Sequence, residues 1–249
     1  VTLAGNGQNG VWGSAGANVI TGGGAIDYIN GGAGNDAISG LGGADNLDGG
    51  AGNDSFNYLL LADLFTTQAS VDTIAGGTGT DIITAGTTGT AFTIADNDVW
   101  TTRITSIETI KLNANNATTN TINLDVTAYA AGVRTIDASA VTGATGNTID
   151  ISEFVATGAT TLTGSATGST VFTGGAGPDL MQGGSAVDTF TVNAGNTGDA
   201  AKGGLGNDIF SFTAALLAAN SASTATYDGE GGTDIMDITD NGATIVDAD

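Results

Sequence analysis

A nine-residue repeat constrains the fold of this chain more than any other feature. The repeat reads G-G-x-G-x-D-x-U-x, where U is a large apolar residue, and it is clearest at 31–39 (GGAGNDAIS) and 49–57 (GGAGNDSFN). It runs without a break from Ala4 to Asn57. Further copies lie at 76–84, 174–182 and 203–211. A period this regular is typical of a solenoid in which each repeat is one structural unit.

Each repeat divides into a strand and a turn. The residues x-U-x are long enough for a short strand with U facing inward, and GGxGxD forms a turn in which glycine permits positive φ. Two repeats complete one coil, so each repeat stacks on the next but one. We therefore predict an all-β chain folded as a parallel β-roll. Its first block has the predicted core ladder Val11, Ile20, Ile29, Ile38, Leu47 and Phe56. A flexible Gly/Asp-rich linker is the alternative, but a linker would not keep an apolar residue at the eighth position.

The sixth position of the repeat predicts a metal site. Carboxylate and carbonyl oxygens in a glycine turn suit Ca²⁺ better than zinc or copper. Stacking places Asn9, Asp27 and Asp45 on one edge of the first block and Asn18, Asp36 and Asp54 on the other, with several calcium ions between successive coils. The Asn turns should bind more weakly because they lack a charge. The predicted side-chain ligands are Asn9, Asn18, Asp27, Asp36, Asp45, Asp54, Asp72, Asp81, Asp179, Asp188, Asp199, Asp208 and Asp234. The predicted carbonyl ligands are Gly23, Gly32, Gly34, Gly43, Gly50, Gly52, Gly77, Gly79, Gly175, Gly177, Gly204 and Gly206.

Composition excludes several classes of function. The chain has no His and no Cys, four Lys plus Arg, and a formal net charge of -22. These counts exclude a His- or Cys-ligated zinc site, a thiol nucleophile and a Ser-His-Asp triad. They also argue against a nucleic-acid partner, and no apolar run is long enough to span a membrane. Acids outside the turns could in principle pair for glycoside hydrolysis, but nothing distinguishes a catalytic pair. We therefore predict that the chain is not an enzyme and has no catalytic residues.

The segment 85–164 lacks the Gly-Asp turns but keeps a ladder of Thr-aliphatic pairs. β-branched residues in alternation predict strands. The predicted inward residues are Ile110, Ile122, Ile136, Ile149, Leu162 and Val171, at intervals of 9 to 14 residues. These intervals favour successive rungs of a β-helix-like region that continues the solenoid. A separate antiparallel sandwich over 85–165 is the alternative.

The sequence also contains a second, much longer repeat that includes several nonapeptides. The pattern from Asp54 to Asp81 recurs from Asp208 to Asp234, with an offset of about 153–154 residues. We predict three segments: a β-roll block at 1–84, the middle region at 85–164, and a second block at 165–249 that partly copies the first. Apolar stretches at 59–65 and 213–220 predict short helical interruptions. The chain begins inside a repeat array, so we expect a fragment or processed form of a protein with tandem modules.

The nonapeptides resemble those of the RTX (haemolysin-type) calcium-binding repeat proteins of Gram-negative bacteria. The resemblance rests on the five clear copies, with degenerate copies at 4–30, 40–48, 183–191, 194–202 and 229–237. It implies a right-handed calcium β-roll, secretion by a type I system and folding outside the cell, but no single activity.

Among such proteins, the Thr/Ala/Gly-rich composition looks most like S-layer proteins. The expected function is a structural protein of the cell surface that assembles with copies of itself as a lattice or filament. Cell-surface polysaccharide is a further candidate partner. The alternatives are the stalk of an adhesin, or the secretion tail of an enzyme.

Overall fold

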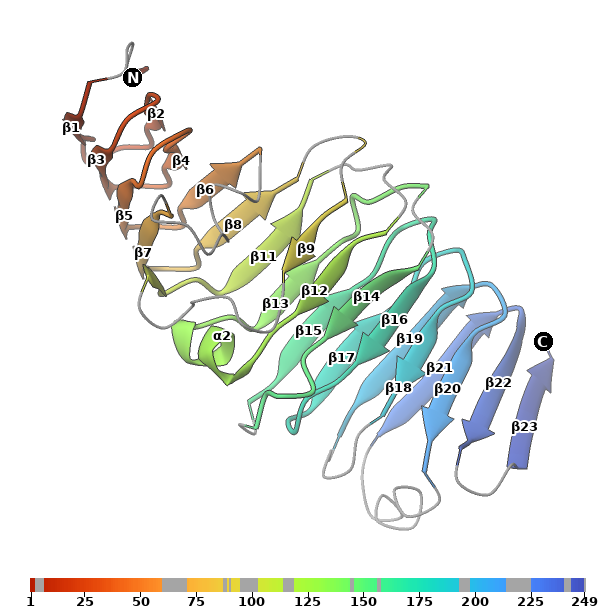
Figure 1. The fold of residues 1–249 in the computed structure, drawn as a ribbon. Helices are drawn as coiled ribbons and strands as arrows, with labels where there is room; N and C mark the ends of the chain where they lie inside the picture. Colours follow the sequence, from red (N-terminus) through yellow and green to blue (C-terminus); the bar gives the residue numbers. More distant parts are fainter. Residues whose placement is uncertain are drawn as a thin grey trace. The chain divides into compact units, whose positions relative to one another are not determined.

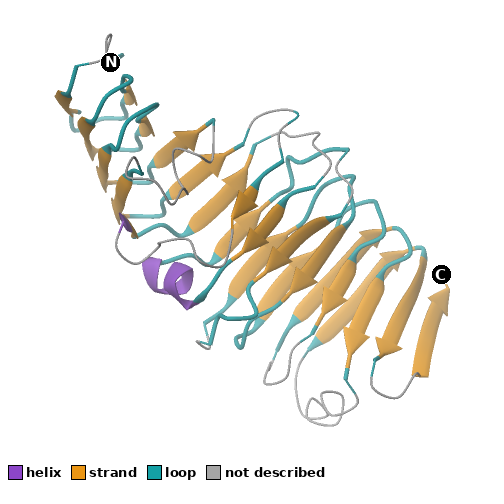
Figure 2. Cartoon of the chain, viewed as in Figure 1, coloured by secondary structure: helices purple, strands orange, loops and turns teal. Residues whose placement is uncertain are grey.

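The computed structural model describes residues 1–2, 7–59, 71–86, 89, 91–94, 103–113, 119–143, 146–155, 158–192, 198–213, 225–239 and 243–248. The chain forms two compact units. Unit 1 comprises Val1–Thr87, Asn97–Lys111 and Ala130–Val133, and unit 2 comprises Thr88–Asp96, Leu112–Tyr129 and Arg134–Asp249. Strands make up most of both units (Figure 2). The predicted all-β class is therefore confirmed.

Unit 1 is built from two stacks of parallel strands, which Figure 1 shows side by side. The strands of the first stack are, in order, β1 (Asn9–Trp12), β3 (Asp27–Ala33), β5 (Asn46–Ala51), β7 (Thr73–Thr78) and β10 (Ile104–Thr105). Those of the second are β2 (Val19–Thr21), β4 (Ala37–Ser39), β6 (Ser55–Tyr58), β8 (Ile82–Ala85) and β11 (Thr109–Leu112). Within the nonapeptide block, odd strands pair with odd strands because every second repeat stacks, as the period predicts.

The core of unit 1 is the apolar ladder of the eighth repeat positions. Ile29 pairs with Leu47 across β3 and β5, and Ile38 pairs with Phe56 across β4 and β6. These four side chains are at most 2% exposed. Ile20 is also buried, whereas Val11 is half-buried. Alternation of apolar and polar residues thus directs one face of each strand inward.

Unit 2 repeats the two-stack arrangement. One stack contains β13 (Thr135–Asp137), β15 (Thr160–Thr163), β17 (Asp179–Gln182), β19 (Ala200–Leu205) and β21 (Thr226–Gly231). The other contains β9 (Thr93–Ile94), β12 (Thr121–Asn123), β14 (Asn147–Asp150), β16 (Thr170–Thr173), β18 (Thr189–Thr191), β20 (Ile209–Phe212), β22 (Thr233–Ile238) and β23 (Ala243–Ala248).

The Thr-aliphatic segment follows the same rule of stacking as the nonapeptides. Ile122 pairs with Ile149, and Ile136 pairs with Leu162, in parallel register. The rungs therefore alternate between two stacks, and the prediction of successive rungs was wrong. Parallel pairing also shows that the antiparallel-sandwich alternative was wrong. The coil here has 27 residues between stacked positions such as Asn120 and Asn147, against 18 between Asp27 and Asp45 in the unbroken nonapeptides.

The prediction that Val171 faces inward was wrong. Val171 is 38% exposed, whereas the next residue, Phe172, is fully buried and pairs with Ile149. Side chains alternate across a strand, so an error of one residue reverses the faces. The ring of Phe172 stacks on that of Phe190 at 4.9 Å between centroids, and Phe190 stacks in turn on Phe210. From Phe172 onward, stacked aromatic rings thus fill the inward positions that aliphatic side chains fill in the earlier strands of this stack.

This register can be tested with two adjacent substitutions. Phe172→Ala should lower the free energy of unfolding by about 3–5 kcal/mol, because it empties a fully buried position. Val171→Ala should change it by less than about 0.5 kcal/mol, as expected for an exposed side chain. Chemical denaturation of the calcium-loaded protein measures both values. Equal losses, or a larger loss at Val171, would contradict the register.

A helix and an antiparallel strand pair are among the features that were not predicted from the sequence. A helix, α2, covers Val126–Ala131, and the Oδ1 atom of Asp125 caps it by accepting hydrogen bonds from the backbone N–H groups of Thr127 and Ala128. The last strand, β23, pairs with β22 in antiparallel register.

The remaining predictions about chain organisation are not tested by the fold. The helical interruptions predicted at 59–65 and 213–220 fall almost entirely outside the described residues. The three-segment division and the continuity of the solenoid stay predictions. Within the described part of the chain, no helix has the length and apolar character needed to cross a membrane.

Candidate metal centre

The sixth-position side chains of unit 1 form two ladders that run from coil to coil. In the first ladder, the backbone N–H of each residue donates to the Oδ1 atom of the residue one coil later, at 2.8–3.0 Å. This ladder contains Asn9, Asp27, Asp45 and Asp72. The second is built in the same way, at 2.7–2.8 Å, and contains Asn18, Asp36, Asp54, Asp81 and Glu108. The structure therefore stacks these residues as predicted and adds Glu108.

Unit 2 has two comparable ladders. Asp179 donates its N–H to Asp199 Oδ1 at 2.9 Å, and the hydroxyl of Thr160 donates to Asp179. The other ladder contains Thr170, Asp188, Asp208 and Asp234, joined by bonds of 2.6–2.8 Å. A threonine therefore precedes the first Asp of each ladder in unit 2, where unit 1 has an asparagine.

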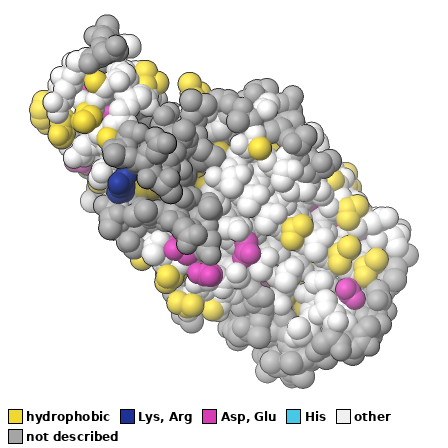
Figure 3. Space-filling view, in the orientation of Figure 1, with side chains coloured by type: hydrophobic (Ala, Val, Ile, Leu, Met, Phe, Trp, Pro, Cys, Tyr) yellow, Lys and Arg dark blue, Asp and Glu magenta, His cyan; other side chains and the backbone are white. Residues whose placement is uncertain are grey.

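The carboxylates of these ladders lie inside the coils. Every sixth-position Asp in the four ladders is 5% exposed or less. On the face drawn in Figure 3, acidic side chains accordingly appear at only a few places, although the chain has 26 of them. Burial of an ionised carboxylate is costly unless it is paired with a cation or a sufficient set of hydrogen bonds. The ladders therefore concentrate negative charge within the fold.

The second oxygen of four of these carboxylates identifies where a cation is needed. One oxygen, Oδ1, already accepts a ladder hydrogen bond. The other, Oδ2, is shielded from solvent and has no hydrogen-bond partner among the described residues in Asp36, Asp54, Asp81 and Asp208. A buried oxygen without a partner costs about 1–3 kcal/mol, and more when it is charged.

The first glycine of the turn brings a second oxygen to the same place. A Cβ atom added to Gly49 would lie closer than 3.0 Å both to Asp54 Oδ2 and to the carbonyl oxygen of Gly76, one coil later. Gly31 has the same relation to Asp36 and Gly49, and Gly203 has it to Asp208 and Gly229. Carboxylate and carbonyl oxygens therefore converge on a space that only glycine leaves open.

These oxygens fit Ca²⁺. Calcium takes six to eight oxygen ligands, including carboxylates and backbone carbonyls. In the described part of the chain, acidic side chains do not gather in groups of three or more that could hold a metal by themselves. Backbone carbonyls must therefore complete the ligand set. A bound Ca²⁺ would supply the positive charge that the buried Oδ2 atoms lack.

Other predicted ligands have side-chain oxygens that already accept further hydrogen bonds from the protein. Asp27, Asp179 and Asp188 each accept an N–H from their own turn on Oδ2, at 2.6–2.8 Å. Asp72 accepts the hydroxyl of Tyr58 at 2.8 Å. Asn18 accepts the N–H of Ser14 on Oδ1. We expect the turns of these residues to need calcium less than those of Asp36, Asp54, Asp81 and Asp208.

The predicted carbonyl ligands differ in their surroundings. The carbonyl oxygens of Gly32, Gly34, Gly50, Gly52 and Gly206 all project toward a glycine of the next coil, and each would lie closer than 3.0 Å to a Cβ atom added there. This contact requires glycine, and Gly50 and Gly52 also have φ of 97° and 131°. By contrast, the carbonyl of Gly23 accepts a hydrogen bond from the N–H of Gly42 at 3.1 Å. Gly175 packs against Phe154.

The remaining predicted carbonyls belong to turn glycines whose own ligand role is untested. Gly43 lies beside Ala25 and Asp45, Gly77 beside Gly50, Gly79 beside Gly52 and Gly204 beside Gly184. Gly177 is buried in the turn before Asp179. Calcium ligation by these residues stays a prediction.

Sequence reasoning missed two kinds of candidate ligand. It assigned carbonyls at the second and fourth turn positions, and it did not name the first-position carbonyls, such as those of Gly49, Gly76 and Gly229, that lie beside the same glycine position as an Asp Oδ2 atom. It also missed Glu108, which lies 27 residues after Asp81, the same interval that separates Asp54 from Asp81. That repeated interval was the available signal.

Burial changes the acidity of the ladder carboxylates. It raises the pKa of Asp81 to about 6, and the charges of Asp54 and Glu108 contribute to the same shift. Burial likewise raises the pKa of Asp179, Asp188 and Asp208 to about 6. The pKa of Asp54 is also raised, chiefly by burial. In the absence of metal, folding therefore favours the protonated form of these groups.

The metal-free protein should consequently become more stable on acidification. A raised folded-state pKa means that the folded state binds more protons, so stability is greatest below about pH 4 and declines as the pH rises through about 6. Thermal melts in excess chelator should show the melting temperature rising as the pH falls from about 6 to about 4, because the folded and unfolded states bind different numbers of protons in that interval. A melting temperature that stays constant over this interval would mean that the ladder carboxylates titrate alike in the folded and unfolded states. A falling melting temperature would contradict the raised pKa values.

Comparison with known proteins agrees with the geometry. Residues 3–36, 21–56, 62–87 and 165–198 match the family described as RTX calcium-binding nonapeptide repeat. No curated protein matches the chain. Repeats of this family bind Ca²⁺ in several turns, so calcium is the cofactor of these blocks.

Proposed function

Because the chain carries RTX calcium-binding nonapeptide repeats, we propose that it is a calcium-folded structural module of a secreted bacterial surface protein. RTX repeats imply an extracellular protein that leaves the cell by type I secretion. The family is defined by calcium binding and not by a reaction. A purely structural role, without catalysis, is part of this proposal.

The buried carboxylate ladders are the observation that carries the proposal. Four Asp side chains hold an Oδ2 atom that is inaccessible to solvent and lacks a hydrogen bond within the described residues. A metal that binds only the folded state adds its binding free energy to folding. Calcium outside the cell would therefore switch on folding of a chain that remains unfolded during export.

Self-assembly as an S-layer or filament is the finer part of the proposal. The offset of about 153–154 residues between the two blocks suits a module repeated along a longer protein. A formal net charge of -22 would keep copies apart unless divalent cations bridge them. Exposed apolar side chains on the strands of unit 2, such as Leu180 at 41% and Leu205 at 64%, offer contact area between copies.

Electron microscopy tests the assembly. In millimolar calcium the protein should form regular sheets or filaments, and these should dissolve when calcium is chelated. Circular dichroism of the same samples separates assembly from folding. Assemblies that persist in chelator would refute calcium bridging. A protein that folds with calcium but stays monomeric at all concentrations would refute self-assembly while leaving the calcium-folded module intact.

A further inference from the structure

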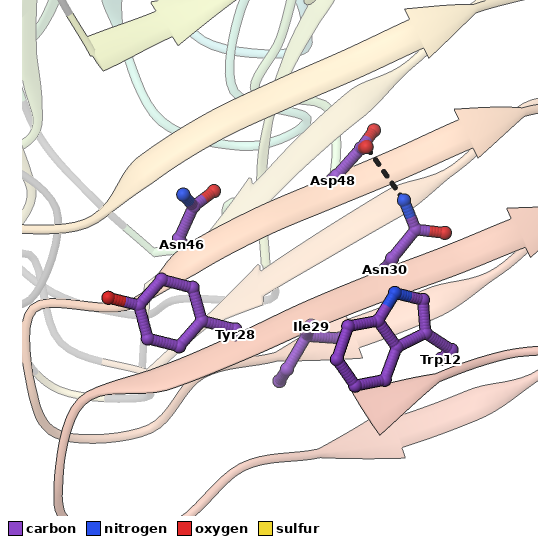
Figure 4. A pocket seen from close by; sticks show the side chains of 6 residues that line it. All are labelled: Trp12, Tyr28, Ile29, Asn30, Asn46 and Asp48. Carbon is purple, nitrogen blue, oxygen red and sulfur yellow. Dashed lines mark hydrogen bonds between the residues drawn. The ribbon is translucent and has the colours of Figure 1, made fainter. Parts of the chain in front are cut away.

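A shallow groove lies on the outer face of unit 1, and none of the ladder residues lines it. Its volume is about 160 Å³, and it is lined by Trp12, Tyr28, Ile29, Asn30, Asn46 and Asp48 (Figure 4). These residues come from three neighbouring strands, β1, β3 and β5. Two aromatic side chains dominate the lining and are unusually accessible, since Trp12 is 75% exposed and Tyr28 is 47% exposed.

The geometry of β1 presents the indole of Trp12 as a flat surface. A Cβ atom on Gly10 would lie 2.9 Å from two atoms of the six-membered part of the indole, so the ring folds back over Gly10. Gly10 is the register partner of Tyr28. A larger residue at position 10 would push the indole away. The absence of a side chain there thus lets Trp12 lie along the sheet on the same face as Tyr28.

Polar groups with both donors and acceptors flank this surface. Asn30 is the register partner of Trp12, and its Nδ2 donates to Asp48 Oδ2 at 2.7 Å. That bond fixes the Asn30 amide and orients the Asp48 carboxylate, as Figure 4 shows. Asn46, on the strand beside Tyr28, adds a second amide. Among the residues that line the groove, none is Lys or Arg.

We propose that this groove binds a neutral polysaccharide, with a pyranose ring stacked on Trp12. An exposed aromatic face suits the apolar face of a sugar ring, and amide and carboxylate groups suit its hydroxyls, which both donate and accept. The Asp48 carboxylate and the acidic chain disfavour anionic ligands. This surface gives the module a means of contact with glycans that does not depend on copies of itself.

The groove also depends on the neighbouring ladder. Strand β3 begins at Asp27 and β5 follows Asp45, and both residues belong to the first ladder of unit 1. Calcium that orders these coils would align the three strands that carry the groove. Sugar binding should therefore require calcium even though none of the predicted metal ligands lines the groove.

Tryptophan fluorescence and calorimetry test the proposal on the calcium-loaded chain. The sequence has only two tryptophans, Trp12 and Trp100, so Trp100→Phe leaves Trp12 as the sole reporter. The probes are the hexasaccharides of β-1,4-linked glucose, mannose and N-acetylglucosamine. At least one should change the emission of Trp12 saturably, with a Kd on the order of 1 mM, as expected for a shallow site. Calorimetry should show that Trp12→Ala abolishes this binding and that Tyr28→Ala weakens it about tenfold.

Val155→Ala is the matched control, because it removes another exposed apolar side chain, in unit 2, and it should leave binding unchanged. Both aromatic variants should keep the circular dichroism spectrum and melting temperature of the parent. The proposal is overturned if none of the three sugars binds, or if Trp12→Ala binds as tightly as the parent. It is also overturned if Trp12→Ala abolishes self-association of a protein that binds no sugar, since the groove would then be an interface between copies.

Discussion

Chelation of calcium is expected to abolish most of the β-sheet circular dichroism of this protein at neutral pH. Near pH 7 the ladder carboxylates are ionised in the unfolded chain. Folding buries them, and among the described residues it leaves the Oδ2 atoms of Asp36, Asp54, Asp81 and Asp208 without a hydrogen-bond partner. Each calcium ion that binds only the folded state adds about 2.7 kcal/mol when its concentration is a hundred times Kd. The summed loss of several such contributions is comparable to the whole free energy of unfolding of a typical domain, about 5–15 kcal/mol.

Magnesium provides the control for this experiment. It is smaller than calcium, prefers octahedral geometry and retains its water ligands. Adding magnesium to the chelated protein should therefore restore little β-sheet signal, whereas excess calcium should restore it fully. A spectrum that chelator leaves unchanged at neutral pH would contradict a calcium-dependent fold.

A single methyl group at the first turn position should lower both the stability of the protein and its affinity for calcium. In Gly49→Ala the new Cβ would enter the space shared by Asp54 Oδ2 and the carbonyl of Gly76. Because one of these neighbours is backbone, the turn cannot yield easily, and overpacking should cost about 1–3 kcal/mol. The variant should also lose calcium affinity, because the methyl group displaces the converging oxygens. Melting temperature and isothermal titration with calcium measure the two effects.

Gly16→Ala is the matched control for that substitution. Gly16 is also a turn glycine of the first block, but a Cβ there would meet no atom within 4 Å. We expect its melting temperature and calcium titration to match those of the parent. Similar losses in the two variants would mean that the cost arises from replacing any turn glycine, and not from the oxygen pair beside Gly49.

The regular part of this structure could be predicted from sequence because the repeat encodes local and long-range information together. One apolar residue in nine sets the inward face at Ile29, Ile38 and Leu47, and the two-repeat coil sets which residues stack. The Asp ladders follow from the same period. That is why the predicted stacking of Asp27 with Asp45 and of Asp36 with Asp54 agrees with the structure.

The errors arose where the period is lost. At Val171 and Phe172 two adjacent apolar residues compete for the inward position, and the larger ring takes it by stacking on Phe190. In the Thr-aliphatic region the coil has 27 residues, so spacing alone could not separate successive rungs from alternate ones. The carbonyls of Gly49 and Gly76 were missed because carbonyl direction depends on backbone angles that glycine leaves open.

The position of calcium in a crystal of the loaded protein tests the central claim most directly. Anomalous scattering locates the ions without assumptions about the ligands. The account predicts calcium within the stacked turns, bound by the Oδ2 atom of Asp54 and the carbonyl of Gly76, and in the same way by Asp208 and Gly229. Ions found only at carboxylates outside the ladders, such as Asp48 and Glu153, with the turns empty, would contradict it.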